Sequence, residues 1–165
     1  MNTTPPAQLI GHALLDDVST EAIAAPRRRK NRNFHPHDAY PAHRLLNAIE
    51  PGSYVAPHRH NDASKDETML VLRGRLGVVL FDDQGQTIAT HALRAGGDPF
   101  GIDIPHGTWH TVFALESGTV FFEAKAGPYV PLEASEKAAW APPEGAPDAV
   151  AYLDRLLQKF SALAD

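Results

Sequence analysis

The stretch Gly52-Ser53-Tyr54-Val55-Ala56-Pro57-His58-Arg59-His60, followed by Glu67 and Gly74, decides the fold prediction for this chain. His58 and His60 are two residues apart, so on a strand both imidazoles point to the same side of the sheet. A second stretch, Pro105-His106-Gly107-Thr108-Trp109-His110, supplies a third imidazole. Three imidazoles and one carboxylate suit a divalent transition metal. The predicted ligands are His58, His60, Glu67 and His110.

The spacing within the first stretch resembles the first signature motif of the cupin superfamily. Five residues separate Gly52 from His58, and six separate Glu67 from Gly74, as that motif requires. The gap from His60 to Glu67 holds six residues, which is longer than the usual family spacing. Because this gap is polar, we expect it to bulge as a loop and to leave Glu67 at the start of a strand.

The second stretch is similar to the second cupin motif, Pro-x-Gly-x-x-His, through Pro105, Gly107 and His110. Ala114 stands where the family often has an Asn. The resemblance implies an all-β cupin fold, a double-stranded β-helix or jelly-roll barrel. It also implies a single divalent metal held by the His and Glu side chains of the two motifs.

Longer stretches resemble a narrower group, the WbuC-type cupin metalloproteins, over roughly residues 20–145. They are Pro26–His35, Arg44–Pro51, Pro57–His60, Phe121–Tyr129 and Trp140–Pro142. This resemblance implies an association with bacterial surface-polysaccharide (O-antigen) gene clusters. It implies no particular reaction, because none is established for that group.

His106 is the alternative third imidazole. It sits in the turn between Pro105 and Gly107, whereas strand alternation favours an inward-facing His110. With His110 facing in, its two neighbours on the strand face out of the barrel.

Glu67 is either a metal ligand or a hydrogen-bond partner that orients a histidine. Asp62 and Asp66 are the carboxylates that would replace it. Divalent Fe, Mn, Zn, Ni and Co are all compatible with this ligand set. Coordination positions left open would admit water or substrate.

Composition points to an ordinary globular protein. A chain of 165 residues with 43% hydrophobic and 21% charged residues is about one domain long and can bury a core. It has no Cys, which excludes disulfides, thiolate ligands and a Cys nucleophile. The net charge of −5 gives no general attraction for nucleic acid, and no apolar run reaches the ~18 residues of a membrane span. The N-terminus lacks the regions of a signal peptide, so we expect a cytoplasmic protein.

We expect three parts: an N-terminal arm over 1–41 with a short helix and a basic run, a barrel over 42–130, and a C-terminal extension over 131–165. Eight short strand-like runs without helices between them favour a barrel over a parallel α/β fold. They are His43–Ile49, Tyr54–His60, Thr68–Leu72, Leu76–Phe81, Thr87–Leu93, Phe100–Ile104, Trp109–Leu115 and Thr119–Ala124. A hairpin is expected at Arg73-Gly74-Arg75.

Helices are expected only outside the barrel. Residues 1–18 are predicted to be irregular, with a short strand near Gln8–Leu15, followed by one or two helical turns over Ser19–Ala25 with Ser19 as N-cap. A broad apolar stripe at helical spacing predicts a second helix over Asp148–Leu163, with Asp148 as its cap.

The basic run Arg27, Arg28, Arg29, Lys30 and Arg32 is either a solvated loop or a run of which some residues reach the barrel mouth. In the second case guanidinium groups would bind a carboxylate, a phosphate or a sugar-nucleotide diphosphate. The candidate substrate-binding residues are Arg27, Arg29, Arg32, Asn33, His35 and Lys125. Glu123 and Tyr129 are the candidate catalytic residues, with a Glu123–Lys125 ion pair as the structural alternative.

Three functions stay open on the sequence. The first is a metalloenzyme, an isomerase or epimerase or an iron-dependent oxygenase, acting on a small polar substrate; the resemblance points to a sugar or sugar nucleotide. The second is a non-catalytic, metal-dependent module that binds a small ligand. The third is a cupin whose metal only stabilises the barrel. Exposed strand edges of such folds invite pairing, so we expect a homodimer.

Overall fold

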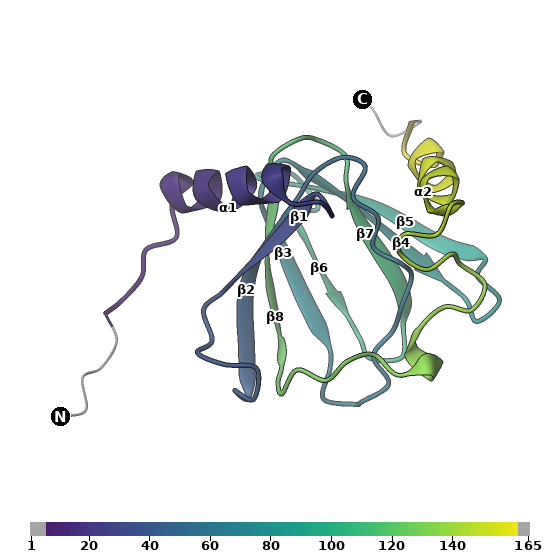
Figure 1. The fold of residues 1–165 in the computed structure, drawn as a ribbon, viewed down its shortest axis with the longest axis horizontal. Helices are drawn as coiled ribbons and strands as arrows, with labels where there is room; N and C mark the ends of the chain where they lie inside the picture. The colour runs from purple at the N-terminus through teal and green to yellow at the C-terminus, as the bar shows by residue number, and fades with distance from the viewer. Residues whose placement is uncertain (1–5, 162–165) are drawn as a thin grey trace.

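The computed structural model describes residues 6–161, and two antiparallel sheets form its centre (Figure 1). The elements in chain order are α1 His12–Ala24, β1 Arg29–Asn33, β2 Ala42–Ile49, β3 Glu67–Arg73, β4 Arg75–Phe81, β5 Thr87–Arg94, β6 Gly101–Ile104, β7 Trp109–Ala114, β8 Thr119–Ala126, a 3-10 turn η1 Ala134–Glu136 and α2 Ala149–Gln158. One sheet has the strand order β1-β2-β8-β3-β6, and the other has the order β5-β4-β7. All pairings are antiparallel.

The two sheets enclose an apolar core. Alternate residues of each strand point between the sheets, because side chains change face at every residue. The buried residues packed there are Ile49, Met69, Val71, Leu76, Val78, Leu93, Ile104, Val112, Ala114 and Phe121. The same inward-facing rows carry polar side chains further along β3, β7 and β8, so one end of the barrel interior is apolar and the other is polar. The polar end is where the candidate site lies.

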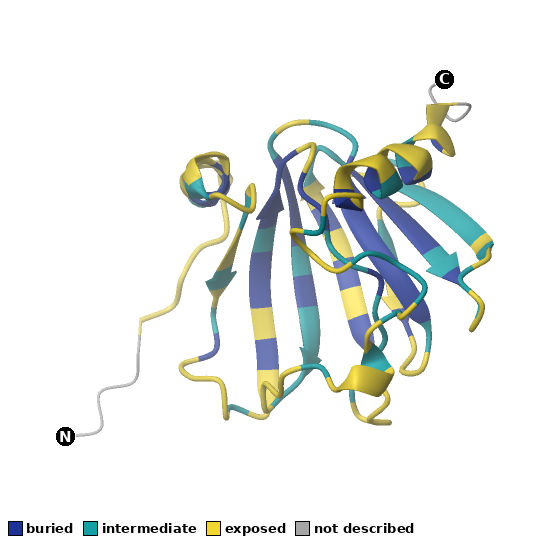
Figure 2. Cartoon of the chain, turned by 45° about the vertical axis from the view of Figure 1, so that its right-hand side comes forward, coloured by how far each residue is buried: buried dark blue, intermediate teal, exposed yellow. Residues whose placement is uncertain are grey.

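Each sheet has a helix on its outer face (Figures 1 and 2). Leu15, Val18 and Ala22 of α1 pack on Leu46 and Val120 of the larger sheet. On the smaller sheet, α2 packs its buried residues Ala149, Leu153 and Leu156 against outward-facing side chains of β4 and β7. The residues of β7 that face out of the barrel are therefore buried as well. The prediction placed the neighbours of His110 outside the barrel but did not include the helix that covers them.

The helix predictions need two corrections. Ser19 is not an N-cap: α1 begins at His12 after Gly11, and Ser19 is buried within it. The expected strand near Gln8–Leu15 is absent: the chain enters α1 at His12, and Leu15, Val18 and Ala22 have helical spacing and face the sheet. The second helix is Ala149–Gln158; Asp148 precedes it but makes no side-chain cap bond. Its predicted end at Leu163 lies outside the described residues.

Two strand predictions were also wrong. The segment 54–60 is extended but is not a strand; only His58 forms a bridge, to His110 and to Lys137. Pro57 lies in the middle of this segment and has no N–H, so it cannot donate a hydrogen bond to a neighbouring strand. In addition, β1 was missed within the basic run, where it pairs with β2 as an edge strand.

Gly74 is a corner between the sheets and not the centre of a hairpin. β3 pairs with β6 and β8, whereas β4 pairs with β5 and β7, so the two strands that flank Gly74 belong to different sheets. Gly74 has φ +73°, and a Cβ on it would lie 2.9 Å from the Cα of Thr119. Residues 82–85 form the turn of a hairpin between β4 and β5.

This crowding at Gly74 gives a first prediction. Gly74→Ala is expected to lower the free energy of unfolding by about 3 kcal/mol, since a left-handed backbone and a steric overlap both oppose a Cβ there. Gly96→Ala is the matched control, because Gly96 also has a positive φ, +69°, but a Cβ there would meet no atom within 4 Å; it should cost about 1 kcal/mol. Urea unfolding measures both. Equal losses would contradict the close approach to Thr119.

Candidate metal centre

The four predicted ligands lie at the polar end of the barrel and come from three parts of the chain. His58 and His60 are on the extended segment between β2 and β3, Glu67 is the first residue of β3, and His110 is the second residue of β7. Backbone bonds join the first and last of these parts: the His58 N–H donates to the His110 carbonyl at 3.0 Å, and the His110 N–H donates to the His58 carbonyl at 2.9 Å. This bridge fixes the two imidazoles side by side.

The donor atoms are close together. One donor atom from each of His58, His60 and Glu67 lies within 4.8 Å of the others. Glu67 is central: its Oε1 is 3.0 Å from His60 Nε2, and its Oε2 is 3.1 Å from His110 Nε2. The ring centroids of His58 and His110 are 4.5 Å apart. Glu67 and His110 are each only 2% exposed, whereas His58 and His60 are partly exposed.

Two of the imidazoles are held by their Nδ1 atoms. A backbone carbonyl can only accept, so His58 Nδ1 donates to the Ala56 carbonyl at 3.0 Å and His110 Nδ1 donates to the Thr108 carbonyl at 2.9 Å. Nε2 is then the atom that each ring presents to the site. Burial, with the neighbouring His110, lowers the pKa of His58 to about 3, which keeps this ring neutral and its Nε2 lone pair available.

Glu67 is ionised in spite of its position. Burial alone would raise its pKa, but hydrogen bonds from His110 and His60 and the charge of Lys125 hold the pKa well below its usual value. Lys125 Nζ lies 2.7 Å from Glu67 Oε1 and 2.9 Å from Glu123 Oε1. Burial opposes the charge of Lys125, yet these two carboxylates raise its pKa above the usual value. The site therefore contains two carboxylates, one ammonium and, at His58, a neutral imidazole.

This donor set fits a divalent transition metal. Ligand atoms about 2.1 Å from an octahedral ion and at right angles to each other are about 3 Å apart, which is the separation between the Glu67 oxygens and the two Nε2 atoms. Metal-binding histidines usually donate their other ring N–H to a carbonyl or carboxylate, as His58 and His110 do. Nitrogen and carboxylate donors without sulfur suit Fe, Mn, Zn, Ni and Co alike.

The alternative ligands lie outside this cluster. His106 Nδ1 pairs with Asp66 Oδ1 at 2.7 Å, with both side chains about half exposed. The carboxylate of Asp62 is used within its own turn, where it accepts from Ser64. As expected, the residues between His60 and Glu67 form a loop, and Glu67 begins β3.

A cavity of about 270 Å³ opens on this donor set from inside the barrel. We call it the inner chamber. Its lining includes three of the donor residues, His58, Glu67 and His110, and it carries charged and amide side chains from β1, β2 and β8 and from the turn just before β1. Those are Arg27, Arg29, Asn31, Asn47, Glu123 and Lys125. Asn47 Nδ2 donates to Glu123 Oε2 at 2.7 Å, so this carboxylate is held between an amide and an ammonium.

Three residues predicted to bind substrate lie elsewhere. Arg32 bonds Glu21 of α1 at 2.9 Å, because alternation on β1 turns it away from Arg29 and Asn31. Asn33 and His35 line a separate cavity with Phe34 and Arg44, and His35 stacks on His43 with ring centroids 3.9 Å apart. Of the basic run, Arg27 and Arg29 line the inner chamber, whereas Arg32 pairs with α1.

Tyr129 is separated from Glu123, the other candidate catalytic residue. It is exposed and lines a cavity of about 220 Å³ together with His58, His60 and Lys125, on another approach to the donor set. The sequence did not single out Asn47 or Glu144. A polar Asn within the apolar strand Ala42–Ile49 was a usable signal for the first, whereas the Pro-rich stretch around Glu144 gave none.

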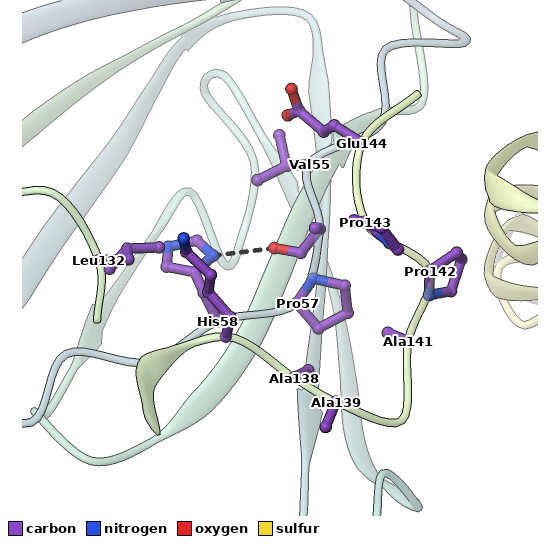
Figure 3. A pocket seen from close by; sticks show the side chains of 12 residues that line it. Val55, Pro57, His58, Leu132, Ala138, Ala139, Ala141, Pro142, Pro143 and Glu144 are labelled. Atoms are coloured by element: carbon purple, nitrogen blue, oxygen red, sulfur yellow. Dashed lines mark hydrogen bonds between the residues drawn. The ribbon is translucent and has the colours of Figure 1, made fainter. Parts of the chain in front are cut away.

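A larger cavity, of about 610 Å³, adjoins the site from the C-terminal side (Figure 3). We call it the outer cavity. The segment from Val55 to His58 lines one part of it, and the segment from Lys137 to Glu144 lines another. Its lining is mainly alanine and proline. Val55 and His58 line both cavities, so both spaces border the candidate metal centre.

Two facing antiparallel sheets with a His and Glu cluster between them define a cupin jelly-roll fold. The chain belongs to the family described as "Domain of unknown function (DUF6016)", whose profile matches residues 10–93, about half of the chain. Among the described residues, none of the helices combines the length and the apolar character needed to cross a membrane.

The fold is similar to several solved structures. CapF, in a structure with the inhibitor 3-isopropenyl-tropolone, matches with a TM-score of 0.53 and 21% identity over 65% of this chain and 30% of that chain. The conserved protein SPY1581 from Streptococcus pyogenes, of unknown function, matches with a TM-score of 0.51 and 13% identity over 78% and 95% of the two chains. A cupin-2 domain containing protein from Shewanella frigidimarina matches with a TM-score of 0.45 and 21% identity over 59% and 80%. At these identities the likeness concerns the fold.

One curated protein is similar in sequence. The tryptophan synthase beta chain from Albidiferax ferrireducens is 34% identical over 73 residues, which cover 44% of this chain. The chain spans 17% of the length of that relative.

Proposed function

We propose that this protein is a cupin that binds one divalent transition metal at His58, His60, Glu67 and His110 and acts as an enzyme on a small polar or anionic molecule. The observation that carries the proposal is the Glu67 carboxylate, which lies about 3 Å from the Nε2 atoms of two histidines within a buried cluster. Such a set of donors, with two rings held by backbone carbonyls, has the form of a preorganised metal site.

The side chains of the inner chamber have distinct roles in this proposal. Arg27 and Arg29 bind an anionic group of the substrate, and Asn31 and Asn47 offer amides to its hydroxyl groups. Glu123, held by Asn47 and Lys125, is the carboxylate placed to accept a proton from a bound substrate. A bound divalent ion would supply Lewis-acid polarisation of a substrate oxygen.

The size of the inner chamber favours a substrate no larger than a sugar. A volume of about 270 Å³ corresponds to the liquid volume of about nine water molecules, which suits roughly one sugar ring. A sugar nucleotide would have to extend into the outer cavity as well. The resemblance to WbuC-type proteins supports a sugar-derived substrate in surface-polysaccharide metabolism, and isomerisation or epimerisation is the reaction type we favour because Glu123 is a ready proton carrier.

Metal content tests the proposal directly. Untagged protein, incubated separately with Fe, Mn, Zn, Ni or Co and then desalted, is expected to retain close to one equivalent of at least one ion by elemental mass spectrometry. At about a thousandfold excess over its dissociation constant, that ion should stabilise the fold by about 4 kcal/mol and raise the midpoint of thermal unfolding by about 10 °C. Protein that stays metal-free with every ion, with no thermal shift, would overturn the proposal.

A further inference from the structure

Glu144 forms ion pairs with Arg27 and Arg29, the two arginines of the inner chamber. Its Oε1 accepts from Arg29 Nη2, and its Oε2 lies 3.5 Å from Arg27 Nε. Each carboxylate oxygen thus meets a different guanidinium group. This two-point arrangement is the one that a planar carboxylate makes with paired arginine donors.

Arg29 is fixed in place, whereas the Arg27 side chain is 67% exposed. Arg29 Nη1 donates to the Tyr54 carbonyl at 2.9 Å and to Ser53 Oγ at 3.2 Å, and Ser53 Oγ donates to the Arg27 carbonyl at 2.7 Å. The Arg29 side chain is only 15% exposed. These bonds hold Arg29 whether or not Glu144 is present.

The Glu144 side of the contact is less constrained. Residues 142–145 belong to no helix or strand, and the Glu144 side chain is 37% exposed. The segment is attached nearby, where Tyr54 Oη donates to the Pro142 carbonyl at 2.7 Å and Trp140 packs on Phe81. Glu144 can therefore leave the arginines by a local movement that keeps these anchors.

The ion pair also joins the two cavities. Arg27 and Arg29 line the inner chamber, and Glu144 lines the outer cavity, which it reaches beside Val55 (Figure 3). The outer cavity therefore contributes the carboxylate of this ion pair, and the inner chamber contributes the two guanidinium groups.

We propose that Arg27 and Arg29 form a carboxylate subsite of the inner chamber, that Glu144 fills this subsite when no ligand is bound, and that the natural ligand is a small hydroxylated carboxylic acid that displaces it. The proposal rests on the anion-binding part of the proposed function and names its substrate class. The protein's own carboxylate indicates the class, because it satisfies both arginines with one oxygen each. The amides of Asn31 and Asn47 are then left for the hydroxyl groups of the ligand.

The test compares a charged and an uncharged probe of the same length. D-gluconate and D-glucitol are titrated into ¹⁵N-labelled protein, loaded with diamagnetic Zn(II) and also metal-free, with the Arg Nε–H signals as the readout. Glu144→Gln removes the internal competitor and should tighten D-gluconate binding about tenfold, while D-glucitol binding should not change. Arg27→Gln should weaken D-gluconate binding about tenfold. Glu116→Gln, which neutralises an exposed carboxylate paired with Arg94, is the matched control and should have no effect.

The outcomes separate this proposal from the one on which it rests. Suppose that Arg27→Gln binds D-gluconate more weakly, but Glu144→Gln binds it no more tightly than the unaltered protein. The arginines would then be an anion site, and the role of Glu144 as an internal competitor would be overturned. If Glu144→Gln bound inorganic phosphate more tightly but not D-gluconate, the assignment of the ligand to the carboxylic acids would be overturned. Unchanged binding in both variants would overturn the subsite altogether, and the metal measurement would still decide whether the metal centre exists.

Discussion

His58→Ala/His110→Ala is expected to retain less than about a tenth of the metal bound by the unaltered protein, because it lacks two of the three imidazoles. Backbone carbonyls hold the Nδ1 atoms of these two rings and so orient their Nε2 atoms toward the site. The substitutions remove both of these oriented donor atoms. Elemental mass spectrometry after incubation with the preferred ion measures the loss. The backbone bridge between the two positions uses main-chain atoms only, so the substitutions leave it intact.

His106→Ala is the control for this experiment. His106 also follows Pro105 and is the other imidazole of its motif, but its side chain is 43% exposed and pairs with Asp66. It should bind as much metal as the unaltered protein. Metal lost from His106→Ala and kept by the double variant would move the site to the His106–Asp66 pair. Near-ultraviolet circular dichroism in EDTA should show that both variants keep the native fold.

The sequence was informative where function depends on short-range geometry. The His-x-His pair of 58 and 60 and the strand that begins at Glu67 follow from spacing along an extended chain, and the structure places these side chains together. The turn residues around Gly107 likewise fix how β7 starts, and hence the inward direction of His110. Such features depend on neighbouring residues, which a sequence displays directly.

The basic run shows where local pattern fails. Its residues have no apolar alternation, so β1 resembles a solvated loop in the sequence. Only pairing with β2 decides which side chains enter the chamber: in this register Arg29 lies opposite Ile49 and Asn31 lies opposite Asn47, while Arg32 points toward α1. The partner strand, and not the run itself, carries that information.

Contacts between residues far apart in the sequence could not be predicted either. Glu144 meets Arg29 across 115 positions of sequence, and nothing near Glu144 indicates that contact. Gly74 presents the same difficulty on a smaller scale, since a turn glycine looks alike in a hairpin and in a corner between sheets. Which of the two forms depends on the strands that pair on either side.

Lys125→Met is expected to lower the free energy of unfolding of the metal-free protein by about 3 to 5 kcal/mol. Lys125 is the ammonium shared by two buried carboxylates, at 2.7 Å from Glu67 and 2.9 Å from Glu123. Methionine keeps much of the side-chain volume but leaves two negative charges close together without a cation. Urea unfolding in the presence of EDTA measures this loss.

Lys65→Met is the matched control. Lys65 lines a cavity beside the same cluster, but its Nζ donates to the carbonyls of Ala126 and Pro128 and not to a carboxylate. Its loss leaves neutral acceptors and should cost about 1 kcal/mol. Equal losses in the two variants would contradict the shared ion pair as the source of the effect.

Metal addition gives the second half of the prediction for Lys125. The unaltered site holds two carboxylates and one ammonium, so it carries a net negative charge that a divalent ion reverses. Without Lys125 the site is more negative and attracts the ion more strongly. The same metal concentration should therefore stabilise Lys125→Met more than it stabilises the unaltered protein, and the gap in unfolding free energy between them should narrow. If this difference in unfolding free energy were the same with and without metal, the ion would not interact with these carboxylates. The affinity of a cation bound beside Glu67 must change when the ammonium that contacts Glu67 is removed.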